Sequence, residues 1–180
     1  MICHKYKCIF IHAPRTGGTS IEFSFGQDVF FEKKHLKASE VFNEVGEKAW
    51  RDYFKFTFVR NPWDRVVSLF CMPAFKKINL LSGKDLAYFL NHYKPYYWEH
   101  GVQCSDYIDR DDLDFIGKFE SRSLDLKKIQ DTIKCPSLSI IHQEKTDHKH
   151  YTEYYDDETK QIVAEKYAKD IEYFGYKFGD

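Results

Sequence analysis

The segment that most constrains the fold lies near the start of the chain, at residues 9–20. It reads Ile-Phe-Ile-His-Ala-Pro-Arg-Thr-Gly-Gly-Thr-Ser, a pattern that predicts a buried strand, a Gly-Gly turn and a helix. Segments of this form bind anions, because backbone N–H groups at the start of the helix face the ligand. Arg15 adds a permanent cation, and Thr19 and Ser20 add hydroxyls that can also cap the helix. The alternative is an ordinary strand-turn-helix corner without a ligand.

Length and composition favour one folded domain over residues 1–180. Of the 180 residues, 43% are hydrophobic and 18% aromatic, which is enough to bury a core and argues against disorder. The formal net charge of −1 gives no field that would attract nucleic acid or a membrane surface. No apolar run approaches the ~20 residues of a membrane span, and the opening residues lack a signal-peptide core. These features predict a cytoplasmic protein in which any anion site is formed by a few neighbouring residues and not by the overall charge.

The cysteines predict reduced, structural thiols. There are five, an odd number with no paired spacing, as cytosolic proteins show. Cys3, His4 and Cys8 have no second cysteine pair with which to complete a zinc tetrahedron, so no metal is expected.

Apolar periodicity predicts alternating strands and helices. Together they predict an α/β fold, a P-loop-like three-layer domain with a mostly parallel central sheet flanked by helices. The predicted strands are 7–12, 29–32, 54–59 and 115–119; the predicted helices are 19–25, one capped by Ser39, 62–71 with Asn61 as cap, 84–92, 124–133 and 156–173 with Asp156 as cap.

A second informative segment, residues 56–68, reads Phe-Thr-Phe-Val-Arg-Asn-Pro-Trp-Asp-Arg-Val-Val-Ser. Arg60 ends the strand at the edge where open α/β sheets bind ligands. Ser68 follows about two helical turns later, on a face that can look back toward Arg60. A guanidinium fork and a hydroxyl suit a phosphate group. The alternative is that Arg60 pairs with Asp64 and Ser68 packs as a small helix residue.

The two segments together resemble the two cofactor-binding motifs of sulfotransferases that use 3′-phosphoadenosine 5′-phosphosulfate (PAPS). Residues 14–20 resemble the 5′-phosphosulfate loop, usually Pro-Lys-Thr-Gly-Gly-Thr-Ser, and residues 58–68 resemble the 3′-phosphate motif. Residues 115–120 are similar to a strand that usually reads Gly-Arg-Phe-Glu. Residues 148–176 resemble the C-terminal segment of the carbohydrate sulfotransferase branch, and residues 71–114 are covered least.

The resemblance implies a PAPS-dependent sulfotransferase that needs no metal. Arg60 and Ser68 would hold the 3′-phosphate, and Thr146 would contact the nucleotide. Arg15 replaces the usual lysine; it can stabilise developing negative charge, but it cannot give up a proton at ordinary pH. The residues expected to hold the 5′-phosphosulfate are Pro14, Arg15, Thr16, Gly17, Gly18, Thr19 and Ser20.

His35 is the candidate general base, because related carbohydrate sulfotransferases carry a catalytic histidine between the two motifs, and histidine suits proton transfer near neutral pH. Glu32 is the reserve candidate, and a surface histidine in a basic loop is the alternative. The acceptor would be a hydroxyl of a small molecule or an oligosaccharide. Ten further side chains have two possible roles: they line the site, or they belong to polar loops and the core. They are His142, His148, His150, Tyr93, Tyr96, Tyr97, Trp98, Lys33, Lys34 and Lys37.

Two other classes remain open at this point. A P-loop nucleotide kinase or NTPase would need Gly-x-x-x-x-Gly-Lys-Ser/Thr and an acidic magnesium ligand after a strand. The loop here lacks that lysine and that spacing, and Arg60 ends the strand instead of an acid. A non-catalytic nucleotide-binding protein of the same fold is the second class, and the exchange of lysine for Arg15 keeps it open.

Overall fold

The computed structural model describes residues 1–26, 35–73, 85–92, 102–135 and 148–180. The chain divides into two compact units. The first consists of Met1–Val59 with Cys104–Glu144, and the second of Arg60–Gln103 with Lys145–Asp180. Each unit is described by itself below, and a single domain over residues 1–180 stays a prediction.

The first unit is built on a sheet whose strands follow the order β1-β2-β3-β4. Strands β2 (Cys8–Ile11), β3 (Phe54–Val59) and β4 (Phe115–Lys118) are parallel, with Phe10 opposite Phe56 and Phe56 opposite Phe115. Strand β1 (Ile2–Cys3) pairs antiparallel with β2. It was not predicted, because a two-residue strand is too short to show a pattern. The parallel strands place their carboxyl ends at one edge, where β2 leads into residues 12–17.

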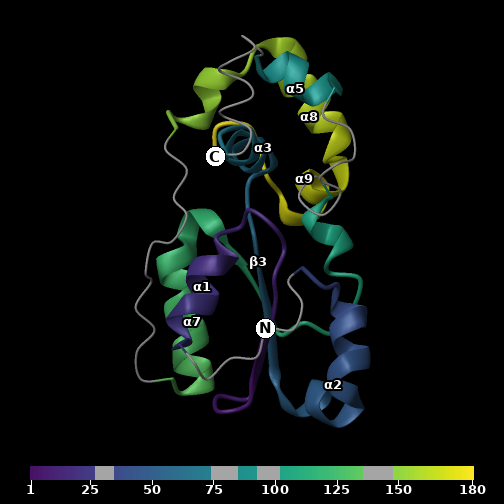
Figure 1. Cartoon of the computed structure of the whole chain (residues 1–180), viewed down its shortest axis with the longest axis vertical. Helices are drawn as coiled ribbons and strands as arrows, with labels where there is room; N and C mark the ends of the chain where they lie inside the picture. The colour runs from purple at the N-terminus through teal and green to yellow at the C-terminus, as the bar shows by residue number, and fades with distance from the viewer. Residues whose placement is uncertain (27–34, 74–84, 93–101, 136–147) are drawn as a thin grey trace. The chain divides into compact units, whose positions relative to one another are not determined.

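Helices cover both faces of this sheet. Helix α1 (Gly18–Ser24) and helix α7 (Arg122–Ile133) lie on one side of β3, and helix α2 (Ala38–Asp52) lies on the other (Figure 1). This arrangement confirms the predicted α/β fold with a mostly parallel sheet flanked by helices. The core between the sheet and α1 and α7 contains Cys3, Cys8, Phe10, Ile21, Phe25, Phe56, Phe58, Leu126, Ile129 and Cys135.

The predicted cap of helix α2 was wrong. The helix begins at Ala38, so its cap position is Lys37, whose backbone N–H donates to Glu40 Oε2 at 2.7 Å. Ser39 instead faces the segment after the 3₁₀ turn Cys104–Asp106, and its backbone N–H donates to Asp109 Oδ1 at 2.8 Å. The serine was misassigned because a cap and a first-turn serine have the same local sequence.

Residues 109–112 also hold the far end of α2. Trp50 Nε1 donates to Asp112 Oδ2 at 2.8 Å, and the Arg110 guanidinium lies 4.3 Å from the centre of the Phe42 ring. The hydrogen bonds from Arg110 and Trp50 hold the pKa of Asp112 at about 2, below its ordinary value of 3.8. Residues 109–112 therefore hold α2 near both of its ends, at Ser39 and at Trp50.

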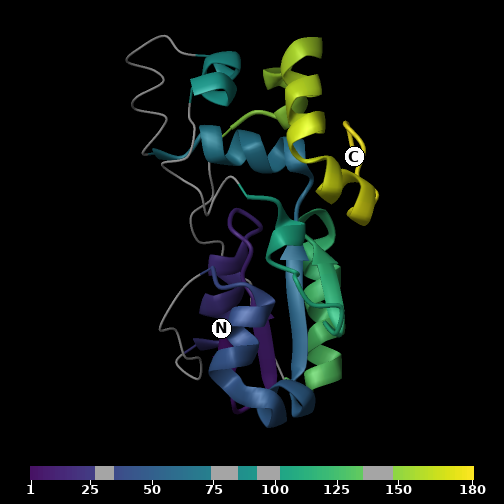
Figure 2. The same ribbon diagram turned by 90° about the vertical axis from the view of Figure 1, so that its right-hand side faces the viewer.

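The second unit is helical in its described part. Helix α3 (Pro62–Phe70) packs with α5 (Leu86–His92) and α8 (Asp157–Lys166) around a common core (Figure 2). Asn61 Oδ1 accepts from the Trp63 backbone N–H at 3.1 Å, which confirms the predicted cap. The buried residues of this core include Trp63, Val66, Val67, Leu69, Cys71, Leu86, Phe89, Tyr151, Val163 and Tyr167.

The single helix predicted over residues 156–173 is two helices. Asp156 caps α8 as predicted, since its Oδ1 accepts from the Thr159 N–H at 2.8 Å. The chain then bends at Tyr167, and α9 (Ala168–Phe174) follows. Tyr167 has φ −112° and ψ 27°, yet its N–H still bonds Val163 and its carbonyl still accepts from Ile171. The bend preserves the apolar period, so the sequence alone does not reveal it.

All five cysteines are buried and none forms a disulfide bond, as expected for structural thiols. Burial raises the pKa of Cys8 above its ordinary value of 9.0, with a smaller contribution from neighbouring Cys3. Among the described residues, no helix is long and apolar enough to cross a membrane.

Candidate functional site

The predicted anion loop forms the turn between β2 and α1. Thr16 Oγ1 donates to the carbonyl of Ala13 at 2.8 Å, which closes the turn. Gly17 follows with φ 79° at the cap position of α1, without a side-chain cap. Thr19 and Ser20 lie inside the first turn of the helix, so the prediction that they cap it was wrong. The strand, glycine turn and helix themselves are formed as predicted.

Both glycines are required by side chains that approach them closely. A Cβ atom on Gly17 would lie 2.6 Å from a terminal nitrogen of Arg122 and 3.0 Å from the Phe119 ring. A Cβ atom on Gly18 would lie 2.2 Å from the His12 ring. Position 18 has no room for a methyl group, and a methyl group at position 17 would displace the Arg122 guanidinium and press on the Phe119 ring. The glycines therefore let an arginine and a histidine pack directly against the loop.

Residues 115–120, the third segment of the family resemblance, lead to the glycine turn, where the Phe119 ring packs against Gly17. After β4 the chain passes through the 3₁₀ turn Phe119–Ser121 into α7, and the Arg122 guanidinium lies 5.0 Å from the centre of the Phe119 ring. Sequence reasoning missed Arg122. The only signal for it is an arginine at the start of the helix that follows a predicted strand.

Asp125 stabilises the same turn. Its Oδ2 accepts from the Lys118 backbone N–H at 3.0 Å and from Ser121 Oγ at 2.6 Å. Burial alone would raise the pKa of Asp125, but the hydrogen bonds from Lys128, Ser121 and Lys118 outweigh it and keep that pKa below its ordinary value. The carboxylate is thus held in its charged form at the end of β4.

His35 lies beside the loop. Its Nδ1 is 3.1 Å from the carbonyl oxygen of His12, the residue that follows β2, and the two imidazole rings meet edge to face with centres 4.5 Å apart. A carbonyl oxygen can only accept, so Nδ1 carries the proton of this bond. In the neutral ring Nε2 then holds a lone pair, which is the form that a general base needs.

Both predicted catalytic residues have a left-handed backbone, with φ 65° at Arg15 and φ 62° at His35. For an L-residue this conformation costs about 1 kcal/mol or more. Such strain gathers at functional sites, where the surrounding structure holds it. The other described non-glycine residues with positive φ are Lys7 and Lys134.

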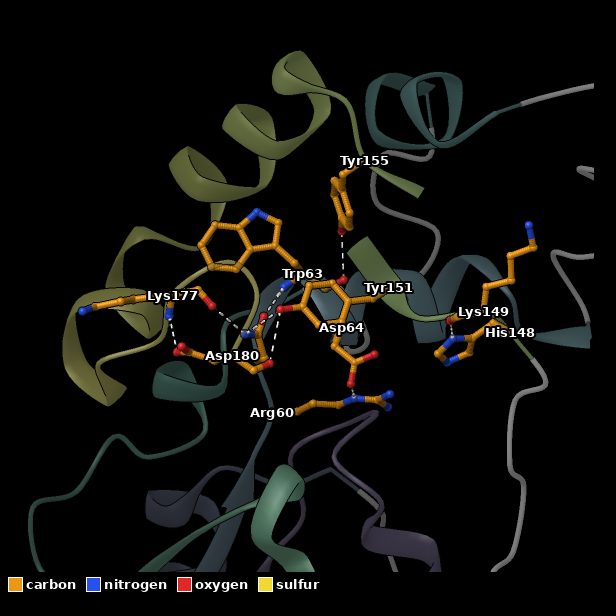
Figure 3. Close-up of polar contacts among 10 residues, drawn as sticks. Arg60, Trp63, Asp64, His148, Lys149, Tyr151, Tyr155, Lys177 and Asp180 are labelled. Carbon is orange, nitrogen blue, oxygen red and sulfur yellow. Dashed lines mark hydrogen bonds and ion pairs between the residues drawn. The ribbon is translucent and has the colours of Figure 1, made fainter. Parts of the chain in front are cut away.

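Arg60 and Ser68, the residues predicted to hold the 3′-phosphate, are buried in the second unit. Arg60 Nε donates to Asp64 Oδ2 at 2.7 Å (Figure 3), so the ion pair considered as an alternative is formed. A guanidinium has five N–H donors, so an ion pair through Nε does not by itself exclude phosphate binding.

The backbone directly after Arg60 is anchored by two side-chain hydrogen bonds. Asn61 Nδ2 donates to the Lys177 carbonyl at 2.9 Å. The Tyr155 hydroxyl donates to the Trp63 carbonyl at 2.8 Å, and burial raises the pKa of that hydroxyl, so it remains a donor at neutral pH. These contacts fix the first turn of α3 and with it the chain position of Arg60.

Two further predicted histidines bond within their own segment. His148 is half-buried and His150 exposed, and their Nδ1 atoms bond to the Lys149 carbonyl and to Thr152 Oγ1. In the part of the chain that the structure describes, no three His, Cys, Asp or Glu side chains gather as a metal site. Predicted residues outside the described ranges are Thr146, Glu32, Lys33, Lys34, His142, Tyr93, Tyr96, Tyr97 and Trp98.

The structure thus brings together the loop, His35 and the end of β4 within the first unit, and describes Arg60 with Ser68 in the second. Joint binding of one ligand by both units stays a prediction. Comparison with curated proteins and with solved structures gave no match. A family model described as "Sulfotransferase family" matches residues 1–177, almost the whole chain. The chain therefore belongs to the sulfotransferase family and is a transferase.

Proposed function

We propose that this chain transfers the sulfuryl group of PAPS to an acceptor hydroxyl, on a carbohydrate, with His35 as general base. The family match supports sulfuryl transfer. The observation that carries the finer proposal is the bond from His35 Nδ1 to the His12 carbonyl, because it makes Nε2 the nitrogen without a proton in the neutral ring of a histidine beside the loop.

Donor binding would use both motifs. In the first unit, the backbone of Gly17 and Gly18 and the hydroxyls of Thr16, Thr19 and Ser20 would hold the 5′-phosphosulfate. In the second unit, Arg60 and Ser68 would hold the 3′-phosphate, and Thr146 would contact the nucleotide. A 3′-phosphate is what separates this donor from ADP and ATP, so Arg60 would determine specificity as well as affinity.

His35 and Arg15 would supply the chemistry. His35 Nε2 takes the proton of the acceptor hydroxyl while the acceptor oxygen forms its new bond to sulfur. The bond from sulfur to the bridging oxygen breaks, and the electron pair stays on the phosphate that leaves. Arg15 stabilises the charge that builds on the bridging oxygen. A guanidinium does this by charge alone, because it does not release its proton.

Two other functions predict different behaviour. A P-loop nucleotide kinase or NTPase would bind ATP with magnesium, and a non-catalytic protein of this fold would bind nucleotide without turnover. The sequence of the loop argues against the first, because it lacks the P-loop lysine and its spacing. The left-handed backbone of Arg15 and His35 is typical of both binding and catalytic sites, so turnover of PAPS separates the second function from the proposed one.

Transfer of ³⁵S from labelled PAPS to a panel of mono- and oligosaccharides tests the proposal. We expect a labelled saccharide and one molecule of 3′-phosphoadenosine 5′-phosphate (PAP) for each sulfate transferred, without added magnesium. Labelled product in equal amount from the His35→Ala protein would remove His35 as the base. PAP binding with no label transferred to any saccharide or to water would favour the non-catalytic protein.

A further inference from the structure

Two buried ionisable side chains in the first unit have no role in the mechanism above. His12 follows β2 and Glu22 lies on α1, and His12 Nδ1 is 2.7 Å from Glu22 Oε1. Their side chains are 4% and 3% exposed. Burying a carboxylate costs free energy of desolvation unless the carboxylate is paired. Two apolar residues at these positions would carry no such cost, so the retention of the pair calls for an explanation.

The His12 ring is in contact with four described neighbours. Its Nδ1 edge faces Glu22, its Nε2 edge faces Gly18, and its flat side stacks on Phe10 at 5.4 Å between ring centres. The fourth neighbour is the His35 ring, edge to face at 4.5 Å. The ring of His12 is therefore the part that connects α1, the glycine turn and His35.

The backbone of the same residue supplies the acceptor that orients His35. The His12 carbonyl accepts from His35 Nδ1 at 3.1 Å. Ring and carbonyl of one residue thus contact the imidazole of His35 at two places. Since Glu22 holds the His12 ring, the ring contact depends directly on the pair, and we infer that the carbonyl contact depends on it through the backbone of the same residue.

We propose that the buried His12–Glu22 pair is a positioning unit for His35, which keeps the His35 imidazole in the Nδ1–H tautomer with Nε2 directed to act as base. His12 and Glu22 touch neither substrate in this account; they act through His35. The inference rests on the proposed function for its catalytic consequence, but the tautomer of His35 is a property of the protein alone.

Glu22→Gln is the sharpest variant, because glutamine keeps the shape and can still accept a hydrogen bond but removes the charge. Thr57→Val is a matched control. Thr57 is also buried, and its Oγ1 donates to the carbonyl of Ile11, one residue before His12, at 2.7 Å. Valine has the same shape, so this variant loses one buried hydrogen bond to the same strand without altering the His12–Glu22 pair.

Long-range ¹H–¹⁵N spectra of the histidine rings give the first readout. In the wild-type protein with neutral rings, we expect His35 protonated on Nδ1 only. In Glu22→Gln we expect a mixture of both tautomers, and in Thr57→Val the wild-type form. A wild-type His35 protonated on Nε2 would overturn the proposal even if no variant folded, and so would an unchanged tautomer in Glu22→Gln.

The second readout is hydrolysis of PAPS to PAP and sulfate, in which water replaces the acceptor. For Glu22→Gln we expect kcat to fall at least tenfold with KM for PAPS unchanged, and for Thr57→Val we expect neither to change. An equal loss in both variants would mean a merely structural pair. If the tautomers behave as stated but wild-type protein neither binds PAP nor turns over PAPS, the proposed function fails while the positioning of His35 stands.

Discussion

His35 Nδ1 lies 3.1 Å from the carbonyl oxygen of His12, so a residue just before α2 is bound to the residue just after β2. In the sequence the two histidines are separated by the loop, by α1 and by a segment outside the described residues. Their contact joins the predicted base to the predicted anion loop in one compact unit. It also determines that Nδ1 carries the proton in the neutral ring of His35.

Replacing His35 by alanine should strongly reduce transfer and leave donor binding unchanged. General base catalysis contributes about 10²–10⁴-fold, so sulfuryl transfer should fall by this factor. PAP affinity, measured by calorimetry, should stay at the wild-type value, because the proposed donor contacts lie in the two motifs. His4→Ala serves as the control, since His4 is also a histidine of the first unit and bonds only the Tyr53 hydroxyl among the contacts described. Wild-type transfer by His35→Ala would contradict the assignment.

Alanine at position 18 should destabilise the protein because of the His12 ring. The new Cβ would lie 2.2 Å from that ring, and overpacking of this kind costs about 1–3 kcal/mol. The free energy of unfolding in urea should show this loss. In a His12→Ala background the same substitution should be neutral or stabilising, since alanine favours a helix over glycine by about 1 kcal/mol. An equal loss in both backgrounds would mean that the ring is not the cause.

Arg60→Gln should weaken PAP binding and reduce the preference for PAP over ADP. A hydrogen bond to a charged group contributes about 1.5–3 kcal/mol, so PAP affinity should fall about 10- to 150-fold while ADP affinity changes little. Asp64→Asn is the matched control, because it removes the charge of the ion pair but keeps the guanidinium. If Asp64→Asn weakened PAP binding as much as Arg60→Gln, Arg60 would act through the ion pair and not on the phosphate.

Local chemistry explains which features the sequence predicted. The strand at 54–59, the Asn61 cap and the Asp156 cap depend on a few adjacent residues, and all three are found as predicted. The break at Tyr167 was missed because the apolar period continues across it.

The site residues divide in the same way. The loop could be found because its glycines and hydroxyls are contiguous. His12, Glu22 and Arg122 could not, because their importance lies in contacts between separate elements. The best local signal was Glu22, an acidic residue between Ile21 and Phe23 in a short, mostly buried helix.

Asp112→Asn should lower stability at neutral pH but not in strong acid. Arg110 and Trp50 hold the pKa of Asp112 at about 2 in the folded protein, below the ordinary 3.8. The charged pair therefore stabilises the fold above pH 4, and this contribution is lost as pH falls from 4 toward 2. Since the pair is partly exposed, the loss at pH 7 should be about 0.5–1 kcal/mol. Urea unfolding at pH 7, 4 and 2.5 measures it, with neighbouring Asp111→Asn as the control; a difference independent of pH would contradict the account.

Thermal unfolding with added nucleotide tests the central claim most directly, because it needs no acceptor. We expect PAP to raise the melting temperature well above the effect of ADP or ATP, without magnesium, and Arg60→Gln to remove most of the difference. Equal stabilisation by ATP, or no stabilisation by PAP, would contradict the claim that this chain uses a 3′-phosphorylated sulfate donor.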